Sequence, residues 1–448
     1  MTASSNMNRM PRIASVRGLA VALVGAMAIL GCGSSAPSLP LSLTIETYPE
    51  GPSFDGDQQN AMLVAFQDGE AGQWQALTGS KGVYHATLTQ ERYAVAMGCI
   101  QVYPDSGQRL SNLTFSYLTV RDNPDIKLTS CDGMSPRVHL SVTVNGASGG
   151  SAAVAAGATN LSKNAASGAY EGDVVQGEPA AALVRLFENS SDSTGEPSRV
   201  YRGPTLDTTA DQAVQYDLSS VGAAPVTEPL SVVGRDPADD VEVISFLIND
   251  RAGLSTSVSQ QTPDAGTAVD HYSTVPVAAG RQPDDLSEIV VLASQKTASV
   301  GGSTSRSAFV AMTNPAAATL TLPEQWSADP PAITGISPFQ VSVTFPVSEP
   351  ILQAVDYDAV LLGGGASHEY FVYVSATWAD GESNVTVTTP DLSNLPGWTS
   401  ELEMTSDSDI QWVIQRSDRN MVRNAPLVDG WRIVTNVVSG SIPASVQP

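Results

Sequence analysis

Cys32 is placed where its thiol could take part in covalent chemistry at the start of a mature chain. It follows an apolar segment, residues 19–30, and the small residue Gly31. The stretch before that segment contains no acidic residue and three arginines: Arg9, Arg12 and Arg17. A basic region, a short apolar core and a small residue before the cleavage point are typical of a secretory signal peptide. The apolar segment is shorter than the roughly 20 residues that a membrane-spanning helix needs. The sequence therefore predicts an exported protein.

The four residues Ile29-Leu30-Gly31-Cys32 resemble the lipobox of bacterial lipoproteins. The resemblance implies that diacylglyceryl is attached to the Cys32 thiol, that residues 1–31 are removed, and that the new amino terminus is acylated, for example with palmitate. Gly33 rather than aspartate follows the cysteine, and by the rule of that family the destination is the outer membrane. Residues 32–39 are expected to form a flexible tether. The alternative is an ordinary secretory signal in which the cysteine is incidental.

With Cys32 occupied by lipid, Cys99 and Cys131 are the remaining cysteines. In an exported chain such an isolated pair predicts one disulfide. Closing a loop of about 30 residues stabilises the folded state by roughly 3–4 kcal/mol on the chain-entropy model. The alternatives are a metal site and two buried free thiols. A metal site with two cysteines needs histidine ligands nearby, and none of the four histidines is at ligand spacing: His85, His139, His271 and His368.

No catalytic motif is recognisable, and no catalytic residue is predicted. The run His368-Glu369-Tyr370-Phe371-Val372 begins like a zinc-protease motif, but valine stands where the second histidine is required. Gly149-Gly150-Ser151 and Gly301-Gly302-Ser303 lack the spacing of a nucleophile elbow. A triad of dispersed residues leaves no such signature. A divergent hydrolase is therefore kept as the alternative.

Carboxylates cluster in three places, at residues 55–57, 236–240 and 380–382. Oxygen ligands of this kind bind calcium, which often stabilises exported β domains. None of the clusters has EF-hand spacing, and aspartate and glycine are common in solvated turns for backbone reasons. The turn interpretation is favoured, with calcium as the weaker hypothesis. No metal site is predicted, and no cofactor other than the covalent lipid.

Most of the tryptophans lie late in the chain, and they allow two interpretations. Exposed aromatic rings can stack on sugar rings, which would make a glycan-binding face. The favoured interpretation is that large aromatic side chains fill the core of a large sandwich. The residues concerned are Trp326, Trp378, Trp398, Trp412 and Trp431.

The chain is strongly acidic, with 22 basic and 46 acidic residues and a formal net charge of −24. Removal of residues 1–31 takes away three arginines, so the mature chain has 19 basic residues and a net charge of about −27. Such a surface repels phosphate backbones and anionic head groups, and nucleic acid is not expected as a partner. Membrane attachment must then depend on the lipid and not on a basic patch.

Composition and pattern both predict an all-β fold. Charged residues make up only 15% of the chain, which has 37 glycines and 29 prolines, as in a β protein with many turns. Period-two alternation and turn signals every 8–12 residues are typical of sandwiches. One short helix is expected at 211–218, and long loops at 255–267 and 298–307. Strands are expected at 41–46, 62–66, 74–77, 82–88, 93–97, 113–120, 138–144, 152–157, 180–187, 241–248, 288–292, 309–312, 339–345, 369–378, 385–389, 412–415 and 431–434.

The predicted organisation is several immunoglobulin-like or prealbumin-like β-sandwich domains in tandem. Residues 40–137 are expected to form a sandwich with the disulfide, 138–232 a second one, and 233–448 one larger sandwich or two smaller ones. Within 138–187, a strand, the turn Asn145-Gly146, a small-residue strand, Gly168-Ala169-Tyr170 and an apolar strand follow one another. This order resembles the prealbumin-like and carboxypeptidase regulatory-like modules of exported proteins.

These features predict a lipid-anchored, extracytoplasmic protein of the cell envelope with a binding or structural role and no catalysis. Its expected partners are the membrane, through the lipid, and either a glycan or other envelope proteins. Two alternatives are a divergent extracytoplasmic hydrolase and an accessory lipoprotein of an envelope complex. The accessory lipoprotein predicts an exposed apolar patch.

Overall fold

The structure is a computed structural model. It describes residues 25–26, 38–48, 61–102, 109–122, 125–129, 136–146, 150–188, 195–263, 269–296, 302–363, 367–405, 409–420 and 428–446. Within these ranges the chain forms strands almost throughout, with two one-turn α-helices, α1 (Leu218–Val221) and α2 (Ala376–Ala379). The all-β prediction is confirmed.

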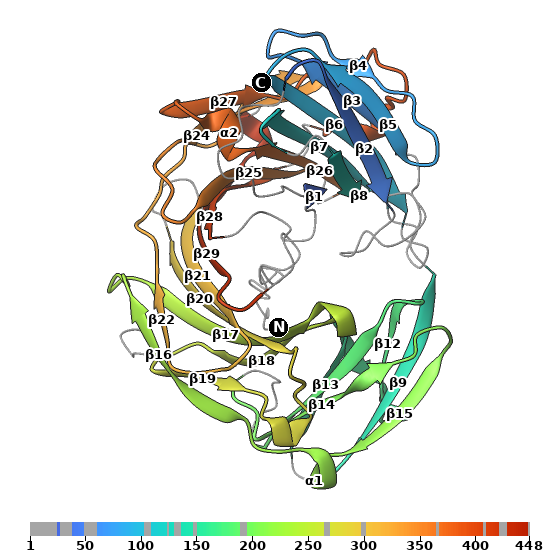
Figure 1. Cartoon of the computed structure of the whole chain (residues 1–448), viewed down its shortest axis with the longest axis vertical. Helices are drawn as coiled ribbons and strands as arrows, with labels where there is room; N and C mark the ends of the chain where they lie inside the picture. Colours follow the sequence, from blue (N-terminus) through green and yellow to red (C-terminus); the bar gives the residue numbers. More distant parts are fainter. Residues whose placement is uncertain are drawn as a thin grey trace, which may run out of the picture.

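The largest sheet of the described structure has twelve strands (Figure 1). Neighbouring strands are antiparallel except β26 and β7, which are parallel. The four strands from residues 63–119 are thus joined side by side, through the β26–β7 pair, to the eight strands from residues 240–442. In spatial order the strands are β18 (Leu254–Gln261), β17 (Asp240–Asn249), β20 (Leu286–Lys296), β21 (Ser303–Met312), β29 (Arg432–Ile442), β28 (Ile410–Arg419), β25 (Ala354–Gly363), β26 (His368–Val374), β7 (Arg109–Thr119), β6 (Arg92–Val102), β3 (Leu63–Asp68) and β4 (Gln75–Ala76).

Three smaller sheets accompany the large one, and their apolar faces pack against it. Two of them cover opposite faces of the same strands, so β6, β7 and β26 lie in a middle layer. Along β6, Tyr93 and Val95 face one core while Ala94 and Ala96 face the other, because side chains alternate between the faces of a strand. The sheets are β1 (Gly25–Ala26), β8 (Asp125–Thr129), β2 (Leu41–Tyr48) and β5 (Val83–Leu88); β19 (His271–Thr274), β16 (Val226–Val233) and β22 (Ala318–Thr321); and β23 (Ala332–Ile336), β24 (Phe339–Pro346) and β27 (Asn384–Thr388).

A separate seven-stranded sheet folds over its own apolar core, which includes Leu140, Val142, Val154 and Val184. β11 pairs with β10 through its first residues and with β12 through its last, which turns the sheet from one layer to the other. In order the strands are β14 (Arg199–Leu206), β13 (Ala180–Phe187), β10 (Ser151–Ala156), β11 (Thr159–Lys163), β12 (Tyr170–Val175), β9 (Arg137–Asn145) and β15 (Gln212–Asp217).

The helix expected at 211–218 is wrong. Gln212–Asp217 is strand β15, which pairs in parallel with β9. Tyr216 is buried and both of its neighbours are exposed. Burial thus alternates at every second residue, as in a strand and not as in a helix. α1 begins only at Leu218, where the Asp217 carboxylate accepts a hydrogen bond from Ser219 N and caps the turn.

Two expected loops contain strands. β18 begins at Leu254, and Thr256 and Val258 follow it toward the interior while serines alternate with them. β21 begins at Ser303, inside the second expected loop. A third difference is at 369–378, where β26 ends at Val374 and α2 follows, capped by Ser375.

The large sheet contains strands from two of the predicted domains. Strands from 40–137 and from 233–448 belong to it, whereas 138–187 forms part of the seven-stranded sheet. The division into three or four domains stays a prediction, as does the prealbumin-like resemblance of 138–187.

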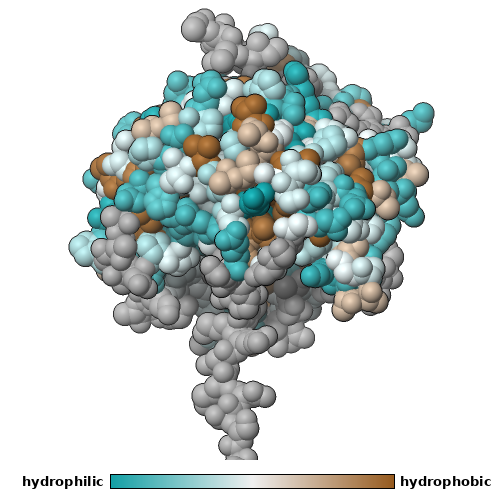
Figure 2. Space-filling model, turned by 90° about the horizontal axis from the view of Figure 1, so that it is seen from below, coloured by the Kyte–Doolittle hydropathy of each residue, from teal (hydrophilic) through white to brown (hydrophobic). Residues whose placement is uncertain are grey.

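On the face shown in Figure 2, hydrophobic residues form small groups separated by hydrophilic ones. Large hydrophobic side chains that are exposed in the described part of the chain are Leu39, Val226, Val233, Val277, Ile336, Ile351 and Val428. No described helix is long and apolar enough to cross a membrane.

Candidate functional site

A groove of about 380 Å³ lies where the β3–β4 hairpin meets the small sheet β23-β24-β27. Its volume is in the range of ordinary ligand sites. One wall comes from β3, the β3–β4 connection, β6 and β7, and the other from α2, the turn after it and the whole of β27. The lining residues are Gln67, Glu70, Trp74, Arg92, Tyr117, Trp378, Glu382, Asn384, Val385, Thr386, Val387 and Thr388.

Trp378 forms an aromatic base for the groove and is only 6% exposed. The ring of Tyr117 meets it edge-on, with 5.4 Å between ring centroids. The Arg92 guanidinium lies over the Trp378 ring, 5.3 Å from its centroid. The Tyr117 hydroxyl donates a 3.1 Å hydrogen bond to the Thr388 carbonyl, and burial raises the pKa of Tyr117 well above its usual value. Tyr117 is thus a neutral donor that ties β7 to β27.

The charges in the groove are two carboxylates and one guanidinium. Arg92 pairs with Glu70 and, at 3.9 Å, with Glu382. The two glutamate side chains are 55% and 51% exposed, whereas Arg92 is 29% exposed. The rim of the groove is therefore acidic. Gln67 donates to the carbonyls of Glu70 and Gly72 and so stabilises the hairpin.

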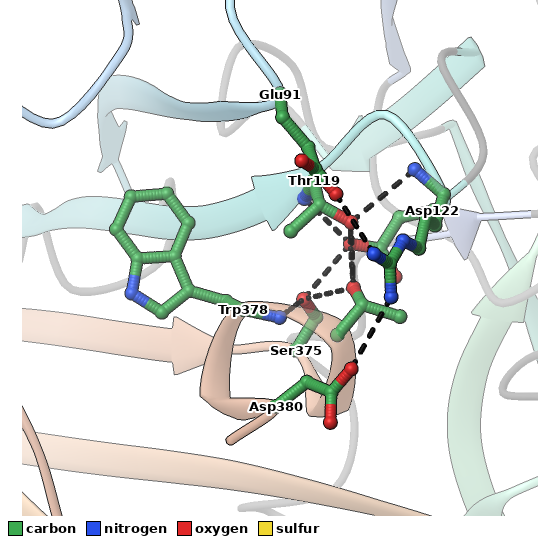
Figure 3. Close-up of polar contacts among 8 residues, drawn as sticks. Glu91, Thr119, Asp122, Ser375, Trp378 and Asp380 are labelled. Carbon is green, nitrogen blue, oxygen red and sulfur yellow. Dashed lines mark hydrogen bonds and ion pairs between the residues drawn. The ribbon is translucent and has the colours of Figure 1, made fainter. Parts of the chain in front are cut away.

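The position of Trp378 depends on a buried polar cluster around Asp122 (Figure 3). Ser375 caps α2, because its hydroxyl accepts a 3.2 Å hydrogen bond from Trp378 N. Asp122 Oδ2 accepts hydrogen bonds from Ser375 Oγ at 2.8 Å, Thr377 Oγ1 at 2.7 Å and Thr119 N at 2.7 Å. Burial raises the pKa of Asp122, and these hydrogen bonds partly offset the rise.

Ion pairs surround this cluster at the surface. Arg121 contacts Glu91 at 3.0 Å and Asp380 at 3.2 Å, which joins the end of β7 to the turn after α2. Segments more than 250 residues apart in the sequence are thus joined by hydrogen bonds and ion pairs, which hold the two walls of the groove together without a ligand.

Within the described residues, the Asp122 cluster contains no serine–histidine pair of the kind used in nucleophilic catalysis. Ser375 Oγ donates to the Asp122 carboxylate and shares a hydrogen bond with Thr377 Oγ1. None of the four histidines lines the groove. His139 contacts Asp173 at 2.9 Å, His271 contacts Asp270 at 2.6 Å and Glu196 at 3.1 Å, and His368 contacts Ser367 Oγ at 2.9 Å.

Two of the carboxylate clusters noted in the sequence form ion pairs and turns. Asp239 pairs with Arg306 at 2.5 Å and also accepts from Asp236 N. Asp380 and Glu382 pair with Arg121 and Arg92. Residues 55–57 lie outside the described residues. In the part of the chain that the structure covers, no three histidine, cysteine or acidic side chains could hold a metal ion together. Calcium binding stays an untested hypothesis.

Of the three cysteines predicted as site residues, the structure describes Cys99. Cys99 is fully buried on β6 and is disulfide-bonded. Cys131 and Cys32 lie outside the described residues, so both the pairing of Cys99 with Cys131 and the lipidation of Cys32 stay predictions.

The favoured core interpretation of the tryptophans is confirmed for Trp378 and Trp412, each 6% exposed. Trp326 and Trp398 are partly buried against the same core. Trp431 meets Phe309 edge-on, 6.0 Å between centroids. Sequence reasoning did not single out Arg92 or Tyr117, and it noted Glu382 only as part of the carboxylate cluster at 380–382. No local signal marks Arg92 and Tyr117, because the groove exists only once β7 and β26 are paired.

Comparisons with known proteins add little. No protein-family model and no curated protein matches the chain. A structure of the Streptococcal ancillary pilin covers 64% of this chain and 100% of its own, with 9% identity and a TM-score of 0.14. The Bacteroides ovatus mixed-linkage glucan utilization locus protein SGBP-B, solved with a mixed-linkage heptasaccharide, covers 93% and 99%, with 10% identity and a TM-score of 0.11. Likenesses this low carry no inference about fold or function.

Proposed function

We propose that the protein is a lipid-anchored, non-catalytic binding protein of the cell envelope and that the groove along β27 is its binding site. The observation that carries the proposal is the preformed groove. Its two walls are joined by the Asp122–Ser375 hydrogen bond and by the bond from Tyr117 to Thr388. A site that is already ordered loses less conformational entropy on binding.

The anchor and the charge support the location. The signal segment ending at Cys32 resembles that of lipoproteins, and the net charge of −24 does not favour electrostatic attachment to an anionic membrane. A thioether-linked diacylglycerol with a third acyl chain is sufficient for stable attachment, whereas a single chain is not. The groove then lies on a protein held at the membrane by its amino terminus.

Fractionation tests the anchor. Wild-type protein is expected in the membrane fraction, and Cys32→Ala is expected in the soluble fraction with an unchanged melting curve. Retention of the variant in the membrane would place the anchor elsewhere and contradict this part of the proposal.

Photo-crosslinking in the native envelope tests the groove. A photoreactive amino acid at Asn384, in the groove, is expected to give covalent adducts. The matched control is Val277, which is 80% exposed and lies in the three-residue helical turn Val277–Ala279, outside the groove. Equal labelling from both positions, or none from position 384, would show that the groove is not the binding site.

A further inference from the structure

β27 has a free edge, and that edge faces the groove. It is the outer strand of the sheet β23-β24-β27, and within the described part of the chain no other strand pairs with it. All five of its residues line the groove. An unpaired edge presents a row of backbone donors and acceptors that another chain can use.

The pattern of hydrogen bonds between β24 and β27 shows which residues of β27 turn their backbone N–H and C=O groups toward the free edge. Val347 N donates to the Ser383 carbonyl and Thr389 N to the Val341 carbonyl, each at 2.9 Å. Because hydrogen-bonded pairs alternate in an antiparallel ladder, Val385 and Val387 make the bonds to β24 that lie between these two. The N–H and C=O groups of Asn384, Thr386 and Thr388 therefore point to the free edge.

Among the residues that the structure describes, most of these outward groups have no hydrogen-bond partner. The Thr388 carbonyl accepts from the Tyr117 hydroxyl. The backbone groups of Asn384 and Thr386 have no outward hydrogen-bond partner among the described residues. They repeat every second residue, a spacing of about 6.8 Å, which is the spacing at which an added strand presents its own donors and acceptors.

We infer that the edge of β27 binds an extended, basic peptide segment by β-strand addition. The inference deepens the proposed function and rests on it, because it assumes that the groove is a binding site. The backbone of β27 supplies the hydrogen bonds, as in other β-strand additions. Glu70 and Glu382, both about half exposed at the rim, favour lysine or arginine side chains on the incoming segment.

The contacts of Trp378 disfavour a glycan stacked on its ring. A sugar ring needs a free aromatic face, but the Arg92 guanidinium lies over Trp378 and Tyr117 meets its edge. With 6% exposure, Trp378 serves as the base of the groove and offers little surface for stacking.

Thr386→Pro is the decisive variant. Proline removes the outward N–H of residue 386 and keeps the bonds of Val385 and Val387 to β24, as edge strands tolerate. Thr386→Val is the matched control, because it keeps the backbone donor and removes only the hydroxyl. Asn384→Pro repeats the test if the first proline variant unfolds. The probe is a pool of short synthetic peptides with lysine at every second position, and the same peptides with glutamate serve as the ligand control.

Binding to the full chain is read by amide hydrogen exchange of residues 384–388. Lysine peptides are expected to slow exchange at Asn384, Thr386 and Thr388, whereas Val385 and Val387 are protected with and without peptide. Thr386→Pro is expected to weaken binding by at least about tenfold, and Thr386→Val to leave it nearly unchanged.

Two outcomes would overturn the inference. One is the absence of alternating protection with the lysine peptides. The other is a carbohydrate adduct from position 384 in the envelope whose yield Thr386→Pro leaves unchanged. If adducts form at 384 but are carbohydrate, the proposed binding function stands and only the peptide inference fails. If no adduct forms there, the proposed function fails as well.

Discussion

The Asp122 carboxylate accepts a 2.8 Å hydrogen bond from Ser375 Oγ across 253 residues of sequence. Ser375 in turn accepts from the backbone N–H of Trp378. One carboxylate at the end of β7 thus determines where α2 begins and where the aromatic base of the groove lies. Three hydroxyl-bearing residues, Thr119, Ser375 and Thr377, share this acceptor.

Asp122→Ala is expected to lower the free energy of unfolding by about 2–4 kcal/mol, because it leaves several buried donors without their charged acceptor. Urea unfolding measures the change. Asp380→Ala is the control, since its side chain is 69% exposed and pairs with Arg121 at the surface. That variant is expected to cost less than about 1 kcal/mol. Equal losses in the two variants would argue against a special role for the Asp122 cluster.

The raised pKa of Asp122 also predicts that the stability of the protein depends on pH. Burial raises its pKa in the folded protein above the unfolded value. A carboxyl group of this kind contributes stability below its unfolded pKa, and the contribution is lost as pH rises through the folded pKa. Asp122→Asn does not titrate, and its amide oxygen can accept the same bonds. Wild type should therefore lose stability relative to the variant as the pH rises from below the unfolded pKa of Asp122 through its raised folded pKa, measured by urea unfolding. A relative gain would mean that the hydrogen bonds outweigh the desolvation.

Arg306 and Asp239 form an ion pair of 2.5 Å whose side chains are 7% and 0% exposed. Arg306 also donates to the carbonyls of Gly234 and Pro323, so it joins β21 to the segments that flank β16 and β22. Asp239→Ala leaves a buried guanidinium without its counter-charge and is expected to cost about 3–5 kcal/mol.

The control for that variant is Glu401→Ala. Glu401 pairs with Arg109 at 2.6 Å, but both side chains are 54% exposed, and a surface pair contributes about 0–1 kcal/mol. Thermal and urea unfolding of both variants give the comparison. A loss for Asp239→Ala that is no larger than that of the control would show that the buried pair adds nothing to stability.

Period-two alternation in the sequence located most strands, because a strand between two layers changes its environment at every second residue. It missed β18, where serines alternate with Leu254, Thr256 and Val258, because small hydroxyl side chains are also common in loops. A helix was predicted where β15 lies, because six residues are too few to distinguish a period of two residues from the 3.6-residue period of a helix.

The groove could not be predicted at all. Arg92 and Tyr117 belong to β6 and β7, whereas Trp378 and Thr388 come more than 250 residues later. They meet because β7 and β26 pair in parallel, and no local pattern reports which distant strands become neighbours. The burial of Trp378 and Trp412 was predictable, because it follows from side-chain size and not from topology.

Cys99 provides the last prediction, because it is fully buried and disulfide-bonded on β6. Peptide mapping without reduction is expected to show it linked to Cys131, since a lipidated Cys32 has no free thiol. Cys131→Ala should then lower the free energy of unfolding by about 3–4 kcal/mol, because the unfolded chain regains the entropy of a closed loop of roughly 30 residues. The same loss should follow when wild type is unfolded in reducing agent, and the reductant should not change the variant. A link from Cys99 to Cys32 would contradict both the pairing and the lipid anchor, since one sulfur cannot carry both bonds.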